Sequence, residues 1–171
     1  MPNWCENQIK ISNSTPAFQD FLKDEGGFSF ERMVKPNRPE FDENGWGTVS
    51  AQADAWGTKW DLDENDAKEV ADTLLRCGMA SFDTAWSPPL EAIRALSAMF
   101  PEVEFTLAYH EQGCAFYGIA EFIDGSCQDS CSDINDRQEY VNFLVNELGY
   151  DEYDAAEWVG LNEEEEQEEV K

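Results

Sequence analysis

Two short aromatic segments bracket residues 56–89. The first is Trp56-Gly57-Thr58-Lys59-Trp60-Asp61 and the second is Phe82-Asp83-Thr84-Ala85-Trp86-Ser87-Pro88-Pro89. Each combines tryptophan, threonine and aspartate within a few residues. Aromatic and β-branched side chains on facing strands stabilise a sheet through cross-strand pairs. The simplest interpretation is that these segments are strands that pair through their aromatic side chains.

The spacing of apolar residues predicts the elements inside and after this stretch. Residues 63–77 have helical spacing and end at a glycine, so they predict a helix, and 79–86 predict the next strand. A Ser-Pro-Pro sequence then begins a helix that ends at residue 99 or 100. Alternation over 103–109 and 115–123 predicts two strands, and the short turn between them predicts an antiparallel hairpin.

The N-terminal third has a similar pattern. Residues 4–12 predict a half-buried strand, and the sequence from Asn13 to Pro16 supplies the start of an amphipathic helix that stops at Gly26-Gly27. We expect a short strand at Phe28-Ser29-Phe30 and a long irregular loop from 36 to about 50. Trp46 lies inside that loop, and we expect its side chain to contact the core.

The sequence changes character after Gly125. Residues 126–135 are small and polar and predict a linker, 136–148 have helical spacing, and 154–160 predict a further short helix. The acid run at 163–169 is typical of a solvated tail. This pattern predicts a domain at 1–125, a linker at 126–135, and an acidic helical extension and tail at 136–171.

The chain is unusually acidic for its size. It has 171 residues, of which 42% are hydrophobic, enough for a core, and 37 acids against 11 bases give a net charge of −26. Residues 124–171 hold 16 of the acids and two of the bases. Such charge repels DNA, RNA and anionic lipid, which argues against direct nucleic-acid or membrane binding.

Five cysteines are present in a sequence without the pattern of a signal peptide or a membrane span. We therefore expect a cytoplasmic protein with reduced thiols. His110, Cys114, Cys127 and Cys131 have loosely zinc-like spacing but lack a tight Cys-x2-Cys pair. They are weak candidates, so free thiols are favoured and neither a metal nor another cofactor is expected.

The order of several motifs resembles one known family. These motifs are Met1-Pro2-Asn3-Trp4-Cys5-Glu6-Asn7, the two aromatic segments, and the hairpin from Tyr109 to Gly118. They resemble the YubB-type, or Api-like, family of small proteins from plasmids and bacteriophages over residues 1–125. Two features depart from the family: 63–77 are helical where it tends to be more strand-like, and the acidic region after Gly125 lies outside the match.

The resemblance implies an α+β fold: a ferredoxin-like antiparallel sheet with helices on one face, followed here by the C-terminal acidic helical extension. The resemblance does not supply a catalytic activity, because the family is essentially of unknown function. The residues that carry its structural signature are Trp56, Thr58, Trp60, Asp61, Phe82, Thr84, Trp86 and Pro88.

The leading functional hypothesis is a non-enzymatic phage or plasmid protein that inhibits a host nucleic-acid-binding defence protein, such as a CRISPR effector or restriction enzyme. Its acidic surface would mimic DNA and occupy the partner's basic groove. The candidate partner-binding residues combine carboxylates with aromatic anchors. They are Asp136, Glu139, Glu147, Asp151, Glu152, Asp154, Glu157, Tyr150, Tyr153 and Trp158.

Two alternatives stay open. The first is an accessory or structural protein of a mobile element whose acidity serves only solubility. The second is an enzyme that uses Asp61, Asp83 and His110, with Lys59 and Glu111 nearby in sequence. Paired carboxylates perform acid and base chemistry when their surroundings separate their pKa values. An ion pair of Lys59 with an aspartate is the structural alternative there, and self-association into a homodimer is also left open.

Overall fold

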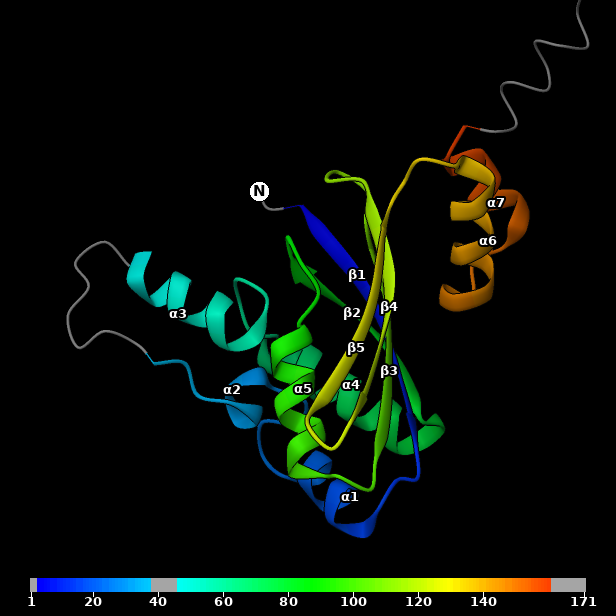
Figure 1. Cartoon of the computed structure of the whole chain (residues 1–171). Helices are drawn as coiled ribbons and strands as arrows, with labels where there is room; N and C mark the ends of the chain where they lie inside the picture. Colours follow the sequence, from blue (N-terminus) through cyan, green and yellow to red (C-terminus); the bar gives the residue numbers. More distant parts are fainter. Residues whose placement is uncertain (1–2, 38–45, 161–171) are drawn as a thin grey trace, which may run out of the picture.

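The computed structural model describes residues 3–37 and 46–160 (Figure 1). The strands are β1 (Trp4–Ser12), β2 (Met79–Ala85), β3 (Glu104–Glu111), β4 (Phe116–Ile123) and β5 (Ser126–Asp133). The helices are α1 (Pro16–Lys23), α2 (Phe30–Met33), α3 (Trp46–Trp56), α4 (Glu64–Cys77), α5 (Leu90–Met99), α6 (Arg137–Leu148) and α7 (Glu152–Trp158). Within the described ranges, no helix is long and apolar enough to cross a membrane.

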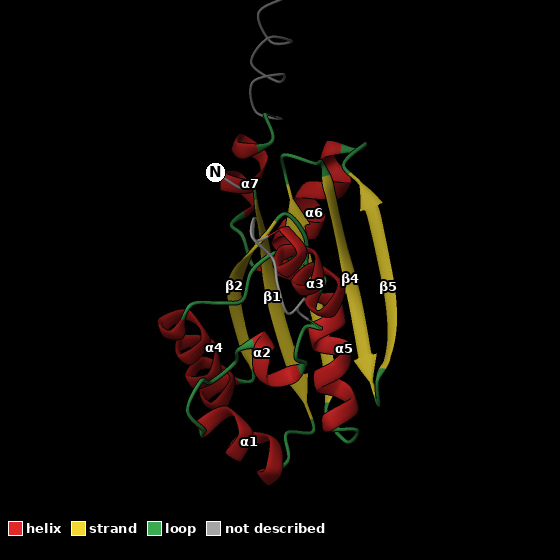
Figure 2. Ribbon diagram, turned by 90° about the vertical axis from the view of Figure 1, so that its left-hand side faces the viewer, coloured by secondary structure: helices red, strands yellow, loops and turns green. Residues whose placement is uncertain are grey.

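The five strands form one antiparallel sheet in the order β2-β1-β3-β4-β5, which confirms the α+β prediction. Successive side chains of a strand point to opposite faces. Ile9 and Leu107 point to what we call the first face of the sheet. Glu6 and His110 point to the opposite side, which we call the second face. Helices α1, α2, α4 and α5 lie on the side of the first face, and α6 and α7 cover the second (Figures 1 and 2).

The first face carries the larger core. Ile9, Phe105, Leu107 and Phe122 from the sheet belong to one buried cluster with side chains from the helices above them. Phe18 of α1 makes edge-to-face contact with Phe105 at a centroid distance of 5.5 Å. Aromatic pairs of this geometry stabilise a core beyond the area that they bury.

The second face has its own, smaller core. Tyr117 of β4 contacts Phe143 and Tyr140 of α6, with ring centroids 4.8 and 5.3 Å apart. Polar contacts fix the far end of α6, because the Gln8 side-chain amide donates to the Leu148 carbonyl over 3.2 Å. The C-terminal helices are therefore packed on the sheet.

The expected pairing of two strands through the aromatic segments is wrong for the first of them. Trp56 is the last residue of α3, and 57–60 form a bend. Gly57 has a φ of 85°, which an extended strand does not allow, and the buried indole of Trp56 donates to the Val34 carbonyl. The two segments still touch, since the Thr58 hydroxyl donates to the Ala85 carbonyl over 2.9 Å.

The short strand expected at 28–30 is also wrong. Phe30 begins α2, because the Asp61 carboxylate accepts from the Phe30 and Glu31 N–H groups at 2.7 and 3.0 Å and from the Ser29 hydroxyl at 2.7 Å. A carboxylate in this position satisfies the free N–H groups of the first turn. The loop expected from 36 to 50 is shorter, because α3 starts at Trp46. The side chain of Trp46, and hence its expected core contact, lies outside the described residues.

The linker expected at 126–135 is largely strand β5. Every residue of β5 is exposed, so its sequence lacks the apolar alternation by which a strand is recognised. Backbone pairing with β4 along its whole length holds it in the sheet. A side-chain bond adds to this, since the Tyr109 hydroxyl donates to Asp129 Oδ1 over 2.6 Å.

The helices predicted near the C-terminus are present. Asp136 caps α6 by accepting from the Glu139 N–H, and Gly149 ends it with a φ of 76°. Helix α7 begins two residues earlier than expected, because Asp151 caps it by accepting from the Tyr153 N–H. The acid run at 163–169 lies outside the described residues.

The cap of α2 gives a test of how the first aromatic segment is held. Replacing Asp61 with alanine leaves the N–H groups of Phe30 and Glu31 without their acceptor, so we expect the free energy of unfolding to fall by about 2 kcal/mol. Asp54→Ala, at an exposed position of α3, is the matched control, with an expected change below about 0.5 kcal/mol. Urea denaturation measures both, and equal effects would contradict this role of Asp61.

Candidate functional site

A row of polar side chains crosses the second face at one end of the sheet. Glu6 of β1 has Asp83 of β2 and His110 of β3 as its register partners. The next partner in the row is Tyr117 of β4. Because side chains at paired positions of antiparallel strands lie on the same face, this register brings two carboxylates and an imidazole together. Helices α6 and α7 lie over the same face.

His110 is the buried centre of this row. Its side chain is only 2% exposed, and its Nδ1 lies 2.6 Å from the Tyr140 hydroxyl of α6. The other ring nitrogen, Nε2, lies 3.3 Å from Glu6 Oε2, at ion-pair distance. The rings of Tyr150 and Trp158 stand edge-on to the imidazole at 6.2 and 5.5 Å.

Glu6 connects the row to the segment before α7. The Tyr150 hydroxyl donates to Glu6 Oε2, and the Tyr150 ring stacks on Trp158 at 6.0 Å. The neighbouring His110 side chain holds the pKa of Glu6 below its ordinary value, against the opposing effect of burial, and the Tyr150 hydroxyl adds to this lowering. Burial and the adjacent Glu6 carboxylate raise the pKa of Tyr150, so its hydroxyl stays a donor.

A cleft of about 300 Å³ opens beside this cluster. We call it the Trp4–Trp158 cleft. Its lining comes from the start of β1, the end of β3 with the following turn, and α7. The lining residues are Asn3, Trp4, Glu6, His110, Glu111, Gln112, Gly113 and Trp158.

Glu111 shapes the floor of the cleft at the β3–β4 turn. Its carboxylate accepts from the Gly113 N–H at 2.7 Å and from the Cys114 N–H at 2.6 Å. Burial alone would raise the pKa of Glu111, but the Cys114 thiol and these N–H groups outweigh it, so the pKa lies below its ordinary value. The side chain is therefore a fixed negative charge at neutral pH.

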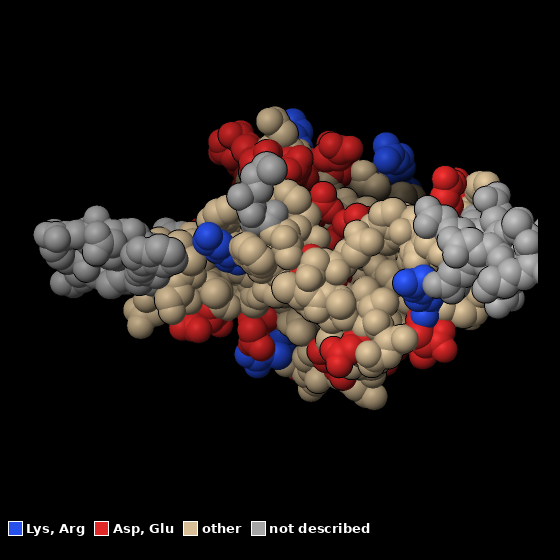
Figure 3. Space-filling model, turned by 90° about the horizontal axis from the view of Figure 1, so that it is seen from above, with Lys and Arg blue, Asp and Glu red and all other residues tan. Residues whose placement is uncertain are grey.

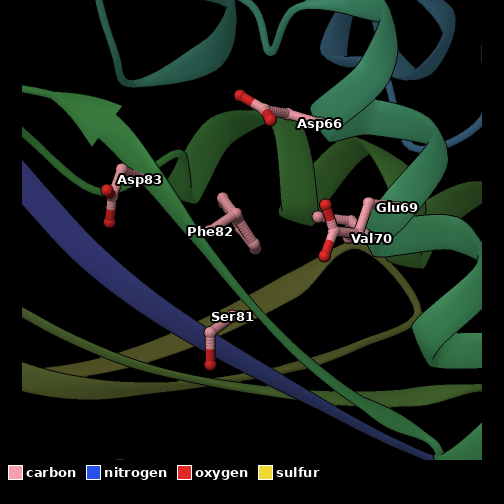
Figure 4. A pocket seen from close by; sticks show the side chains of 6 residues that line it. All are labelled: Asp66, Glu69, Val70, Ser81, Phe82 and Asp83. Atoms are coloured by element: carbon pink, nitrogen blue, oxygen red, sulfur yellow. The ribbon is translucent and has the colours of Figure 1, made fainter.

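A second cleft, of about 330 Å³, lies between α4 and β2. Figure 4 shows Asp66 and Glu69 of α4 on one side and Asp83 of β2 on the other, with Phe82 between them. The carboxyl of Asp83 is partly shielded from solvent, and this shielding, together with the nearby Glu6 and Asp66, raises its pKa. The neighbouring carboxylates therefore disfavour the ionised form of Asp83.

The residues of the enzyme hypothesis do not form one site. Asp83 and His110 flank Glu6, whereas Asp61 caps α2 and belongs to a different part of the fold. Lys59 lies over the ring of Trp60, 4.6 Å from its centroid, and has no ion pair to an aspartate within the described part of the chain. The expectation that Asp61 and Asp83 lie on adjacent strands is wrong.

The four weak zinc candidates are spread out. His110 is buried under α6, Cys114 lies in an exposed turn, and Cys127 and Cys131 are exposed on β5. Four residues of a strand span about 13 Å, too far for the two β5 thiols to share an ion. Among the described residues, no group of three or more His, Cys, Asp and Glu side chains has a metal-binding arrangement.

The candidate partner-binding residues divide into two groups. The residues of the first group make contacts within the fold. Asp136 and Asp151 cap helices, and Glu147 forms an ion pair with Lys10 at 3.8 Å. Tyr150 and Trp158 contact the His110 cluster. The others are exposed on α6 and α7. They are Glu139, Glu152, Tyr153, Asp154 and Glu157.

Sequence reasoning missed Glu6, Trp4 and Tyr140 as parts of this site. The available signal was the alternation of β1, which places Trp4, Glu6 and Gln8 on one face. Trp4 is 52% exposed and lies 6.5 Å from the ring of the exposed Trp60. Exposed indoles at the same end of a sheet are typical of contact surfaces.

The hydroxyl of Tyr150 allows a test of how α7 is held. Tyr150→Phe removes a charge-assisted hydrogen bond to Glu6, and we expect the free energy of unfolding to fall by about 1–2 kcal/mol. Tyr153→Phe removes the same hydroxyl from a side chain that is 67% exposed and serves as the control. Thermal or urea unfolding compares the two variants. No difference between them would contradict the proposed attachment.

The raised pKa of Asp83 predicts a pH-dependent effect. A carboxyl whose pKa is higher in the folded state than in the unfolded state favours folding when protonated, and this contribution is lost as the pH rises through the folded pKa. Asp83→Asn should therefore stabilise the protein at pH 7, by at most about 1 kcal/mol because the side chain is exposed to solvent. At pH 3 the gain should disappear. Urea denaturation at both values tests the sign.

Comparison with known proteins identifies the family of this fold. A family model described as a ferredoxin-like domain in Api92-like protein matches residues 55–144. The match contains β2 to β5 and most of α6, so it begins later and ends later than the resemblance over 1–125, and it leaves out β1. No curated protein and no solved structure matches the chain. Because the model covers more than half of the chain, the protein belongs to the family of Api92-like proteins with this ferredoxin-like domain.

Proposed function

We propose that this protein is a non-enzymatic inhibitor, carried by a phage or plasmid, that binds the basic groove of a host nucleic-acid-binding defence protein. A CRISPR effector or a restriction enzyme has such a groove. The observation that carries the proposal is the charge of β5, α6, α7 and their connections. Residues 124–160 hold ten acids and one base, Arg137, and all of the acids except the half-buried Glu147 are exposed.

The balance of charge favours a basic partner. Proteins that bind duplex DNA obtain much of their affinity from cationic grooves, and release of counterions makes that affinity depend on salt. An acidic protein competes for the same groove with the same electrostatics. Figure 3, which shows the molecule from above, has more Asp and Glu than Lys and Arg side chains on the visible surface.

The packing of α6 and α7 supports a specific surface rather than a generally charged one. Tyr140, Phe143 and Leu144 fix α6 to the sheet, and Tyr150 fixes the start of α7. Glu139, Glu152, Asp154 and Glu157 therefore project from a rigid backbone. A preorganised surface loses less conformational entropy on binding than a flexible acidic tail.

Matched charge variants test the proposal. The first variant neutralises exposed acids of α6 and α7 through Glu139→Gln, Glu152→Gln, Asp154→Asn and Glu157→Gln. The control neutralises exposed acids of α4 and of the turn before β3 through Glu64→Gln, Glu69→Gln, Asp72→Asn and Glu102→Gln. Both variants change the net charge equally, so any difference in binding reflects where the charge lies.

The immobilised protein is incubated with nuclease-treated bacterial lysate, and retained proteins are eluted by salt and identified by mass spectrometry. We expect a nucleic-acid-binding protein that loses DNA binding in a gel-shift assay when this protein is added. The α6–α7 variant should bind it at least about tenfold more weakly, and the control nearly as well as the natural chain. Binding that is indifferent to salt, or equal losses in both variants, would contradict the proposal.

A further inference from the structure

The Trp4–Trp158 cleft contains a polar atom that the fold leaves unsatisfied. His110 Nε2 is buried and has no hydrogen-bond partner among the described residues. It lies 3.3 Å from Glu6 Oε2, at ion-pair distance, but the two atoms form no hydrogen bond. The side chain is 2% exposed and lines the cleft. A buried polar atom without a partner destabilises the fold, so binding of a ligand that reaches it is favoured.

The charges around the cleft select the sign of that ligand. Glu6 and Glu111 line it, and the described part of the chain contributes no Lys or Arg to the lining. The pKa values of both carboxyls lie below their ordinary values, so both are ionised at neutral pH. Anionic ligands are therefore repelled and a cation is attracted.

The walls of the cleft favour a flat cation. Trp4 and Trp158 contribute indoles that are 52% and 40% exposed, from β1 and α7 respectively. The Trp158 ring stands edge-on to His110, with a centroid distance of 5.5 Å. A guanidinium group stacks on indole faces and donates several hydrogen bonds in its own plane, whereas an ammonium group is a compact point charge.

We propose that the Trp4–Trp158 cleft binds the side chain of an arginine on the partner protein. The guanidinium stacks against the indoles and donates to the carboxylates of Glu6 and Glu111. When the guanidinium is bound, His110 takes the tautomer in which Nδ1–H donates to the Tyr140 hydroxyl and Nε2 accepts from the guanidinium. The guanidinium then replaces the imidazole as the group that stabilises the negative charge of Glu6. This inference rests on the proposed function, because it names one contact of a basic partner.

A titration of the isolated protein tests the cleft without the partner. The probe is N-acetyl-arginine amide, followed by the ¹⁵N–¹H signals of the tryptophan indoles and the ring nitrogens of His110. We expect saturable shifts of Trp4, Trp158 and His110 Nε2, with the exposed Trp86 indole unchanged. N-acetyl-citrulline amide has the same shape without the charge and should give no saturation. Equal binding of citrulline, or of N-acetyl-lysine amide, would overturn the proposal, as would the absence of saturation.

Variants connect the titration to the named residues. Glu6→Gln should weaken binding of the arginine probe at least about fivefold, because a charge-assisted hydrogen bond becomes a neutral one. Glu121→Gln, at an exposed acid of β4, is the matched control and should bind normally. Glu6 also accepts a hydrogen bond from Tyr150, so a change at Glu6 affects more than the probe. Trp4→Ala is therefore the second variant, because about half of the Trp4 side chain is exposed to solvent. Unchanged binding by Trp4→Ala would overturn the proposal.

The same variants separate this inference from the proposed function. If Trp4→Ala binds the captured nucleic-acid-binding protein as tightly as the natural chain, the arginine site is wrong while inhibition through α6 and α7 stands. If no such protein is captured but the arginine probe saturates the cleft, the proposed function is wrong while the cleft remains an arginine site. Loss of both bindings in Trp4→Ala supports the cleft as the partner's contact point.

Discussion

Burial of both faces of β3 is the constraint on which the rest of the structure depends. Phe105, Leu107 and Tyr109 are buried among the first core, while Ala108 and His110 are buried on the opposite face. Without cover, that second face would leave a half-apolar surface in water. Helix α6 supplies the cover, and its Tyr140 meets both the imidazole of His110 and the ring of Tyr117. The C-terminal helices are thus required by the sheet itself.

Much of the fold follows from local sequence. Helix α4 is bounded by Asp63, which accepts from two N–H groups of its first turn, and by Gly78 with a φ of 72°. Both signals are local, so the sequence alone predicts this helix. The segments that were predicted wrongly depend on contacts outside themselves: α2 on the carboxylate of Asp61, which lies far along the chain, and β5 on backbone pairing with the neighbouring strand β4.

The candidate site was less accessible to sequence reasoning. Asp83 and His110 were recognised as candidates, but Glu6, which lies between them, was not. Its role depends on the register of three strands that are far apart in the chain, and register is set by tertiary pairing. The sequence groups Asp61 with Asp83 because both were expected on adjacent strands, whereas the Asp61 carboxylate caps α2.

The exposed strand β5 gives the acidity a second consequence, one that needs no partner. A free sheet edge is a template on which further strands add, and natural edges resist this with charge. Asp129 and Asp133 belong to this edge strand, and two chains that joined through β5 would bring four carboxylates into one narrow junction. Their repulsion opposes growth of the sheet into aggregates. Residues that make the chain acidic therefore also protect its open sheet edge.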